Sequence, residues 1–271
     1  MGYRKFWLTN SKNTRFELTD LSVKNFFNAP SGLGFTDTLT FVRYGEKTNV
    51  NSDSYNMPSV SGTITFWDKA NSSRYKQYND FVRFTMEKPL QLHYEIPLST
   101  PAEYVLDCYV TNIQKTESTV QGIMDCSVTF QGLSFWKGAT VTQTGTSTSY
   151  VVTNGGDCPV GFEIDIQGSL ANPFITLEQD NELYGECKFD DLTSFDEVYV
   201  NSKDGEQNVV LKQGGYILAN PLSYQDLSIS NGAIYVTFCK LARGTSTLTV
   251  GYDSGSLTSV DISFAPIYRS V

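Results

Sequence analysis

The sequence contains one histidine, His93, and no two cysteines spaced as a C-x-x-C pair. A Ser-His-Asp or Cys-His catalytic site would have to use His93, and a zinc site needs clustered Cys and His side chains. His93 lies in an alternating stretch, on the face opposite Leu92 and Tyr94, which is typical of an ordinary strand residue. The sequence also lacks a G-x-S-x-G nucleophile elbow and a G-x-x-x-x-G-K phosphate loop. We therefore expect no catalytic residue, no metal and no cofactor.

Long apolar segments are also missing. No run approaches the roughly 20 residues that cross a bilayer, and the start of the chain lacks the apolar core of a signal peptide, so we expect no membrane insertion. The five cysteines are Cys108, Cys126, Cys158, Cys187 and Cys239. Their odd number and wide spacing favour free thiols in a reducing compartment.

Positive charge is scarce in the second half of the chain. The formal net charge is -9. Up to Trp136 there are 13 Lys and Arg residues against 13 Asp and Glu, whereas from Lys137 onward there are 7 against 16. Tight non-specific nucleic-acid binding requires many Lys and Arg side chains to replace counterions. The charge balance therefore argues against that class of function.

The sequence is rich in short alternating segments. There are 16 Tyr and 17 Phe residues, and aromatic and β-branched residues favour strands. In the first half we predict strands at 6–8, 15–18, 38–44, 60–67, 90–96, 104–113 and 122–130. One segment differs: Ser72 or Ser73 is a candidate cap for a helix from Arg74 to about Met86, which Pro89 ends. The first half is thus expected to be α+β, with an antiparallel sheet and one helix.

The composition changes near Gly138, where residues 140–149 are uncharged and consist mostly of Thr and Ser. We place a domain boundary at about Trp136, which gives domains 1–136 and 137–271; the alternative is a polar strand within one continuous sheet. In the second half, strands are predicted at 150–152, 161–166, 198–200, 209–211, 233–238, 247–252 and 259–265. Asp204-Gly205 indicates a hairpin, and the series as a whole suggests a β-sandwich.

Acidic and aromatic residues of the second half are candidates for binding sites. The segment 178–182 lacks the spacing and the glycine of a calcium loop, so we interpret it as a solvated turn. Tyrosines such as Tyr184, Tyr199 and Tyr216 are candidates for stacking on a sugar, although a position in the sandwich core or on a solvent-facing strand is the simpler interpretation. All three tryptophans, Trp7, Trp67 and Trp136, fall in the first half and in apolar contexts that predict core or interface roles.

Several short segments of the first half occur in a recognisable order. They are Trp7-Leu8-Thr9-Asn10, Phe16-Glu17-Leu18-Thr19-Asp20, Gly32-Leu33-Gly34-Phe35, Tyr78-Asn79-Asp80-Phe81, Leu90-Gln91-Leu92-His93-Tyr94, Val110 to Glu117, and Leu133-Ser134-Phe135-Trp136. Together they resemble the distal tail proteins of long, non-contractile-tailed bacteriophages. The matching positions are Gly32, Gly34, Phe35, Lys115, Glu117, Leu133 and Trp136. In the second half the resemblance is looser and rests on residues 221–227 and 241–248.

The resemblance implies a structural protein of the virion tail tip, made in the bacterial host cytoplasm. Domain 1–136 would form a homo-hexameric ring between the tail tube protein and the tail fibre or tail-associated lysin. DNA would pass through its channel only in transit. Domain 137–271 would be a galectin-like sandwich that supports receptor-binding or accessory baseplate proteins. This half lacks the His and Trp that sugar-binding galectins use, so the resemblance would describe its fold and not a lectin activity.

Two other classes of function remain open from the sequence. The first is a carbohydrate-binding module for host cell-wall sugars. The second is a cell-wall hydrolase, which would need only two carboxylates, although no particular pair is marked. A tail hub predicts a closed oligomer without activity, a carbohydrate-binding module predicts saturable sugar binding, and a hydrolase predicts turnover of wall polysaccharide.

Overall fold

The computed structural model describes residues 4–20, 22, 25–44, 47–68, 70–100, 102–116, 123–189, 195–213, 216–219, 234–236 and 238–271. The chain divides into two compact units. Unit 1 comprises Met1–Ala139 together with Tyr268–Val271, and unit 2 comprises Thr140–Ile267. The division thus falls three residues beyond Trp136, and the last four residues of the chain belong to unit 1.

Unit 1 is built from one large antiparallel sheet, one helix and one separate hairpin. Its elements are β1 (Lys5–Thr9), β2 (Arg15–Glu17), β3 (Thr19–Asp20), β4 (Asn25–Ser31), β5 (Asp37–Tyr44), β6 (Lys47–Tyr55), β7 (Ser59–Trp67), α1 (Asn71–Thr85), β8 (Leu90–Ile96), β9 (Ala102–Thr116), β10 (Ile123–Gly132) and β11 (Trp136–Lys137). The main sheet has the order β2-β1-β8-β9-β10-β7-β4-β3, and β11 pairs with β9 and with β23 (Ile267–Tyr268).

Alternation along each strand places one face of this sheet in the core. In β8, Leu90, Leu92 and Tyr94 are buried, whereas Gln91 is exposed and His93 is partly covered. Phe6, Phe66 and Phe130 from other strands join the same core. The α+β prediction for the first half is confirmed, and the predicted strand at 90–96 coincides with β8.

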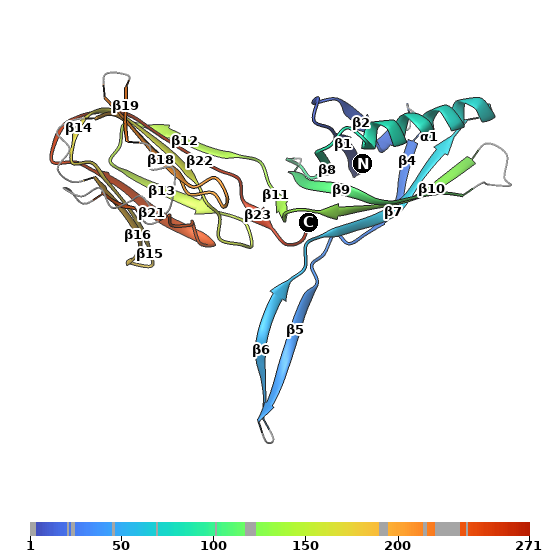
Figure 1. Ribbon diagram of the computed structural model, residues 1–271, viewed down its shortest axis with the longest axis horizontal. Helices are drawn as coiled ribbons and strands as arrows, with labels where there is room; N and C mark the ends of the chain where they lie inside the picture. The colour runs from blue at the N-terminus through green and yellow to red at the C-terminus, as the bar shows by residue number, and fades with distance from the viewer. Residues whose placement is uncertain are drawn as a thin grey trace. The chain divides into compact units, whose positions relative to one another are not determined.

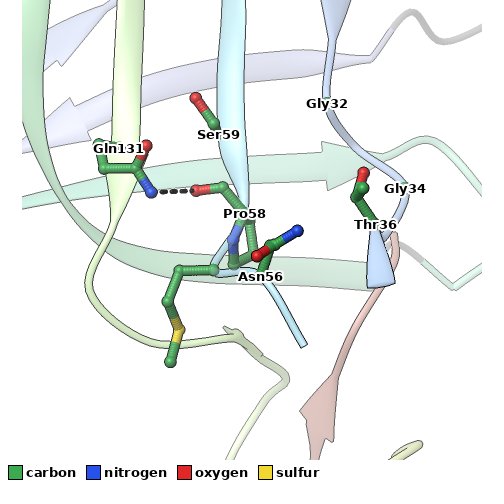
Figure 2. Close-up of a pocket in the computed structure, with 8 residues that line it drawn as sticks. Gly32, Gly34, Thr36, Asn56, Pro58, Ser59 and Gln131 are labelled. Carbon is green, nitrogen blue, oxygen red and sulfur yellow. Dashed lines mark hydrogen bonds between the residues drawn. The ribbon is translucent and has the colours of Figure 1, made fainter. Parts of the chain in front are cut away.

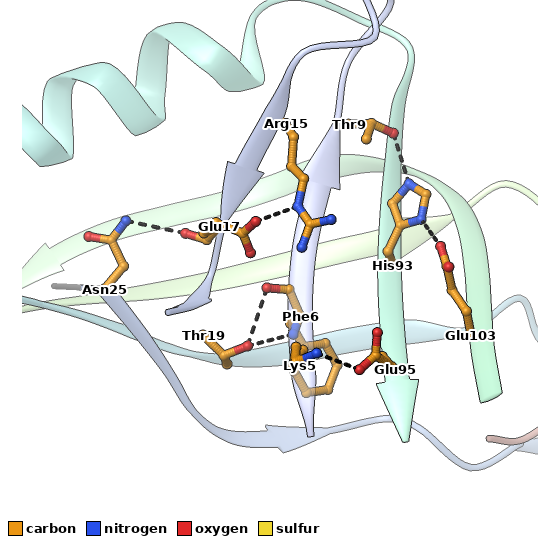
Figure 3. A network of polar contacts seen from close by, with 10 residues as sticks. All are labelled: Lys5, Phe6, Thr9, Arg15, Glu17, Thr19, Asn25, His93, Glu95 and Glu103. Atoms are coloured by element: carbon orange, nitrogen blue, oxygen red, sulfur yellow. Dashed lines mark hydrogen bonds and ion pairs between the residues drawn. The ribbon is translucent and has the colours of Figure 1, made fainter. Parts of the chain in front are cut away.

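The two ends of the main sheet meet (Figure 3). The amide of Phe6 in β1 donates to Thr19 Oγ1 in β3 at 2.6 Å, and the amide of Leu18 donates to the Phe6 carbonyl at 2.9 Å. The sheet therefore curls round on itself, so that β3, the strand at one edge, is hydrogen-bonded to β1, which lies next to the opposite edge. This closure covers edges that would otherwise offer unpaired backbone groups to other chains.

Helix α1 lies across the core face of the sheet (Figure 1). Phe81 is fully buried, and the ring of Tyr78 meets Phe66 edge-on at 6.3 Å. The predicted cap at Ser72 or Ser73 is wrong, because the helix begins at Asn71 with Ala70 as its N-cap. Asp68 supplies the missing acceptor, since its carboxylate accepts from the Ala70 amide and from Ser73 Oγ.

Strands β5 and β6 form a two-stranded arm of unit 1 that lies outside the main sheet (Figure 1). Their register runs from Asp37 opposite Tyr55 to Tyr44 opposite Lys47, with one irregularity after Thr40. Among the described residues, neither strand of the arm has a third strand as a neighbour. The segment Gly32 to Phe35 leads into the arm, and β5 coincides with the strand predicted at 38–44.

Unit 2 consists of two antiparallel sheets. Its strands are β12 (Val141–Gly145), β13 (Ser149–Asn154), β14 (Glu163–Ala171), β15 (Phe174–Gln179), β16 (Glu182–Phe189), β17 (Phe195–Asn201), β18 (Asn208–Gln213), β19 (Tyr216–Ala219), β20 (Ile234–Val236), β21 (Gly244–Gly251) and β22 (Ser254–Phe264). One sheet has the order β12-β22-β14-β17-β18-β19 and the other β13-β21-β15-β16-β20. Buried residues of both sheets form one core, so the predicted mainly β sandwich architecture is confirmed.

Turn predictions in unit 2 also hold. Within the acidic segment 178–182, Asp180 (φ 53°) and Asn181 (φ 65°) form the turn between β15 and β16, with the positive φ that tight hairpin turns require. Gly205, at φ 78°, lies in the turn between β17 and β18. Asp190-Asp191 and the motif at 221–227 lie outside the described residues.

Candidate interaction surfaces

A pocket of about 460 Å³ lies where the arm leaves unit 1 (Figure 2). Two segments far apart in the sequence, 32–36 and 56–59, form its walls together with Gln131 of β10. Its lining residues are Gly32, Gly34, Thr36, Asn56, Met57, Pro58, Ser59 and Gln131. None of these side chains is charged, so the pocket offers hydroxyl, carboxamide and backbone groups together with the apolar side chains of Met57 and Pro58.

Hydrogen bonds fix the walls of this pocket. The Asn56 amide donates to the Thr36 carbonyl at 3.1 Å and Asn56 Nδ2 donates to Thr38 Oγ1 at 3.1 Å, which ties the two strands of the arm at its base. On the other side, Gln131 Nε2 donates to the Pro58 carbonyl at 3.4 Å (Figure 2). Sequence analysis missed residues 56–59 because they do not alternate; Pro58 between two strands is the signal that marks them.

The family-motif positions do not lie together in the structure. Gly32 and Gly34 line the pocket, and the side chain of Phe35, which follows them, is 57% exposed. Leu133 is 49% exposed, two residues beyond Gln131. Trp136 is fully buried in the core, 6.3 Å from the ring of Tyr94.

Lys115 lies elsewhere, on the helix side of the sheet. Its ammonium group is 4.7 Å from the ring centroid of Tyr75 and 5.8 Å from that of Tyr78, within the range of cation–π attraction. Lys115 thus joins β9 to α1. Glu117, the neighbouring motif position, lies outside the described residues.

The outer face of the main sheet has a charged half around β1, β2 and β8. The rings of Trp7 and His93 stack at 5.0 Å, and the Arg15 guanidinium lies 4.1 Å above the Trp7 ring while it pairs with Glu17. Figure 3 shows His93 between Thr9, at 2.9 Å, and Glu103, at 2.8 Å. These contacts account for His93 without any catalytic partner.

Further ion pairs continue this charged half. Lys5 pairs with Glu95 and Lys137 with Asp107, each at 2.7 Å. Partial burial raises the pKa of Asp107, but hydrogen bonds from Lys137 and Gln91 outweigh burial and leave this pKa below its ordinary value. Most of the described charges on this half are therefore already paired within the subunit.

The other half of the outer face, on β4, β7, β9 and β10, carries mostly hydroxyl and carboxamide side chains, with the apolar side chains of Phe26, Trp67 and Ile123 toward one end. We call it the neutral face; its residues are Asn28, Ser61, Thr63, Thr65, Asn112, Gln114, Ser127 and Thr129, with the single carboxylate Asp125. They bond to one another: Ser61 Oγ meets Thr129 Oγ1 at 2.9 Å, and Thr65 Oγ1 donates to Asp125 at 2.8 Å. No Lys or Arg lies among these described positions.

The three sugar-stacking candidates of unit 2 do not gather at one place. Tyr184 is 51% exposed and lies in β16 beside a register irregularity. Tyr199 is half-buried in β17 and donates a hydrogen bond to Glu163; burial and that carboxylate raise its pKa to about 12. Tyr216 lies in β19, in the other sheet from Tyr184. The structure therefore leaves Tyr184 as the one exposed candidate among the described side chains.

Carboxylates gather on the outer face of the six-stranded sheet. Asp165 in β14 lies directly opposite Asp261 in β22. Burial and then the charges of Glu197 and Asp261 raise the pKa of Asp165. Glu197 pairs with Lys212 at 2.5 Å and Glu163 with Lys203 at 2.8 Å, whereas no ion pair of Asp165 or Asp261 is formed within the described part of the chain.

In the described residues, no three His, Cys, Asp or Glu side chains are arranged to hold a metal ion. No described helix is long and apolar enough to span a membrane. The five cysteines are free thiols.

Comparisons with known proteins bear on unit 1 and on the whole fold. The family model described as "Distal tail protein, N-terminal domain" matches residues 5–133. No curated protein sequence matches the chain significantly. The matched residues 5–133 span most of unit 1, including the arm, the pocket and most of both halves of the outer face.

Two solved structures share the fold along nearly the whole chain. The SPP1 Dit (gp 19.1) protein, described as a paradigm of hub adsorption apparatus in Gram-positive infecting phages, has a TM-score of 0.68 at 11% identity and covers 96% of this chain and 98% of its own. A chain of the phage P2 baseplate in its activated conformation with Ca has a TM-score of 0.58 at 12% identity, with complete coverage of both chains. Residues 5–133 therefore match the N-terminal domain of the distal tail protein family.

Proposed function

We propose that this protein is the hub of a long, non-contractile phage tail. Six copies of unit 1 form a ring that joins the tail tube to the tail-tip fibre or lysin, and DNA passes through the ring during ejection. The family match over residues 5–133 and the shared fold with phage baseplate and hub proteins support this role. The protein would then reside in the virion tail tip and act as a structural, non-enzymatic component.

The observation that carries the proposal is the β5–β6 arm. An isolated two-stranded hairpin is marginally stable in water at best, because both of its edges leave backbone groups unpaired. The rest of unit 1 covers its sheet ends, through Thr19 and Phe6. A two-stranded arm without a third strand suits a ring in which each subunit's arm lies against the neighbouring subunit. Such a head-to-tail contact repeats from subunit to subunit until the ring closes.

The neutral face suits the wall of the channel. DNA that must slide through a ring is held back by Lys and Arg, which replace its counterions. The neutral face presents bonded hydroxyl and carboxamide groups and one carboxylate. The charged half of the same sheet instead has ion pairs already formed, such as Lys5 with Glu95. We therefore assign the neutral face to the channel.

Unit 2 supplies the outward-facing part in this proposal. Its two sheets and shared core are compatible with a galectin-like sandwich. Receptor-binding or accessory baseplate proteins would attach to it. Its sixteen Asp and Glu residues against five Lys and Arg within 140–267 favour partners with positive surface charge.

A second candidate function is sugar binding by unit 2. The exposed ring of Tyr184 favours it, since aromatic faces stack on sugars. Saturable binding of cell-wall polysaccharide that is lost in Tyr184→Ala and retained in Tyr199→Phe would establish this function. If the wild-type protein does not bind the polysaccharide, the second candidate function is rejected and the tail hub remains the one proposed function.

The arm gives a direct experiment on the hub. Residues 39–53 are replaced by Asn-Gly, so that Thr38 and Ser54 join through a short turn. We expect this variant to keep the thermal transition of unit 1 but to lose ring formation and binding to the tail tube protein. The matched control replaces the β15–β16 turn residues Asp180 and Asn181 by Asn-Gly and keeps the ring. A ring that survives loss of the arm would contradict the role of the arm.

A further inference from the structure

Strand β12 is an edge strand without the features that usually protect edges. It pairs with β22 along an unbroken register, Val141 opposite Phe264 to Gly145 opposite Val260. Natural edge strands are commonly protected by Lys, Pro or a bulge. The nineteen residues 138–156 contain no charged residue and no proline, and the register of β12 shows no bulge.

The side chains of β12 do not anchor it in the core. None of its five residues is buried, and Val141 is 40% exposed. By contrast, Tyr150 and Val152 of β13, the next strand, are buried. The described part of the chain provides no second strand beside β12. Because β12 forms backbone hydrogen bonds with a described strand along one edge only, its other edge is well placed to pair with an added strand.

The charges beside β12 indicate what kind of strand would fit. Thr144 is opposite Asp261 in β22, and Asp261 is opposite Asp165 in β14. These three side chains form one row on the outer face, and its two carboxylates have no ion-pair partner among the described residues. The pKa of Asp165 is raised by burial and by its acidic neighbours. A cation brought over this row would relieve that repulsion.

We propose that the free edge of β12 receives an extended strand of a basic partner protein, which places a Lys or Arg over Thr144 and Asp261. Backbone hydrogen bonds of the added strand would supply affinity, and the cation would set its register. A second copy of this chain is a poorer occupant, because unit 2 has sixteen acidic against five basic residues and two copies repel. The inference deepens the proposed attachment role of unit 2 and rests on it.

The test uses the full-length protein and three fluorescent octapeptides of alternating Thr and Val. One peptide has a central Lys, one a central Glu, and one has two prolines that prevent strand pairing. At low salt we expect the Lys peptide to bind at least about fivefold more tightly than the Glu peptide, and the proline peptide not to bind. The variant Asp261→Lys, which Asp165 would neutralise, should reverse the preference between Lys and Glu.

Thr153→Lys on β13 is the matched control, because Thr153 is an exposed threonine on the other uncharged edge strand. It should leave peptide binding unchanged. The proposal is overturned if no strand peptide binds up to about 1 mM, if Asp261→Lys keeps the preference for Lys, or if only Thr153→Lys abolishes binding.

Self-association gives one more outcome. A dimer that persists in the presence of peptide and disappears in Thr144→Lys would identify a second copy as the occupant and overturn the partner proposed here. Failure of the ring is seen separately: a monomeric mass both alone and with saturating tail tube protein, together with normal peptide binding, rejects the ring and retains the strand site.

Discussion

The α-carbon of Gly32 lies against the backbone of Ser59: a Cβ at Gly32 would be 1.9 Å from the Ser59 carbonyl oxygen. Gly32 also has φ +83°, a conformation that side chains disfavour. Gly34, two residues away, has no heavy atom within 4 Å of the corresponding position. Both glycines match the family motif, but only Gly32 is required by the packing of unit 1.

Gly32→Ala should therefore lower the free energy of unfolding of unit 1 by about 2–4 kcal/mol, because neither backbone segment can give way cheaply. Gly34→Ala should change it by less than about 0.5 kcal/mol. Urea unfolding followed by tryptophan fluorescence reports on unit 1, since all three tryptophans lie there. Equal effects of the two substitutions would contradict the assignment.

Removal of Tyr268–Val271 should destabilise unit 1, although these residues end the chain. The Tyr268 ring meets Tyr104 edge-on at 5.2 Å, and the Val271 amide donates to the Leu33 carbonyl at 2.9 Å. We expect the deletion to cost about 2–3 kcal/mol, visible as a lower midpoint of the tryptophan-reported transition. Tyr184→Ala, which removes an exposed ring in unit 2, should leave that transition in place. An unchanged midpoint after the deletion would contradict this role.

Two carboxylates of β14 should show opposite pH dependence. The raised pKa of Asp165 means that its ionised form opposes folding above that pKa and that the opposition fades as pH falls through it. Asp165→Asn should thus stabilise unit 2 at pH 7 by up to about 1 kcal/mol, with little gain near pH 4. Urea unfolding followed by circular dichroism at the two pH values measures this.

Glu163 is the matched control. Partial burial raises its pKa, but hydrogen bonds from Lys203 and Ser263 outweigh burial and leave the pKa lowered. Its stabilising effect is present above its unfolded pKa and is lost as pH falls through the folded value. Glu163→Gln should therefore destabilise unit 2 at pH 7 by about 0.5–1 kcal/mol and less under acid. Parallel behaviour of the two variants would refute the account.

The thiols should differ in reactivity. Burial raises the pKa of Cys108 to about 12 and those of Cys126 and Cys239 to about 11, so almost no thiolate forms at pH 8. We expect Ellman's reagent at pH 8 to modify these three only after unfolding, and the half-buried Cys158 first in the native protein. Rapid native labelling of Cys108 in a Cys158→Ser background would show that the β9–β10 core opens.

Sequence patterns predicted the regular parts of the fold because local alternation determines which face of a strand is buried. The predicted strands at 60–67 and 104–113 fall within β7 and β9. Strand β4 escaped prediction because Pro30 and the positive φ of Ala29 interrupt its alternation. Strand β6 escaped it because its sequence, from Lys47 to Tyr55, is almost wholly polar.

The candidate sites were less predictable because they combine distant segments. The pocket joins Gly32, Ser59 and Gln131 through strand pairing that no local pattern encodes. The neutral face became visible only once the register placed Ser61 opposite Thr129. The uncharged segment 140–149 was recognised in the sequence as a change of composition, but its role as an open edge depends on the pairing of β12 with β22 alone.

The central claim is that unit 1 closes into a six-membered ring, and the solution mass of the purified protein tests it most directly. Light scattering coupled to size exclusion, repeated over a hundredfold range of concentration with and without the tail tube protein, gives that mass. The account predicts a particle of roughly 180 kDa, six times the 30.2 kDa chain, alone or on the tube protein. A mass of 30.2 kDa under every condition, including saturating tube protein, would contradict it.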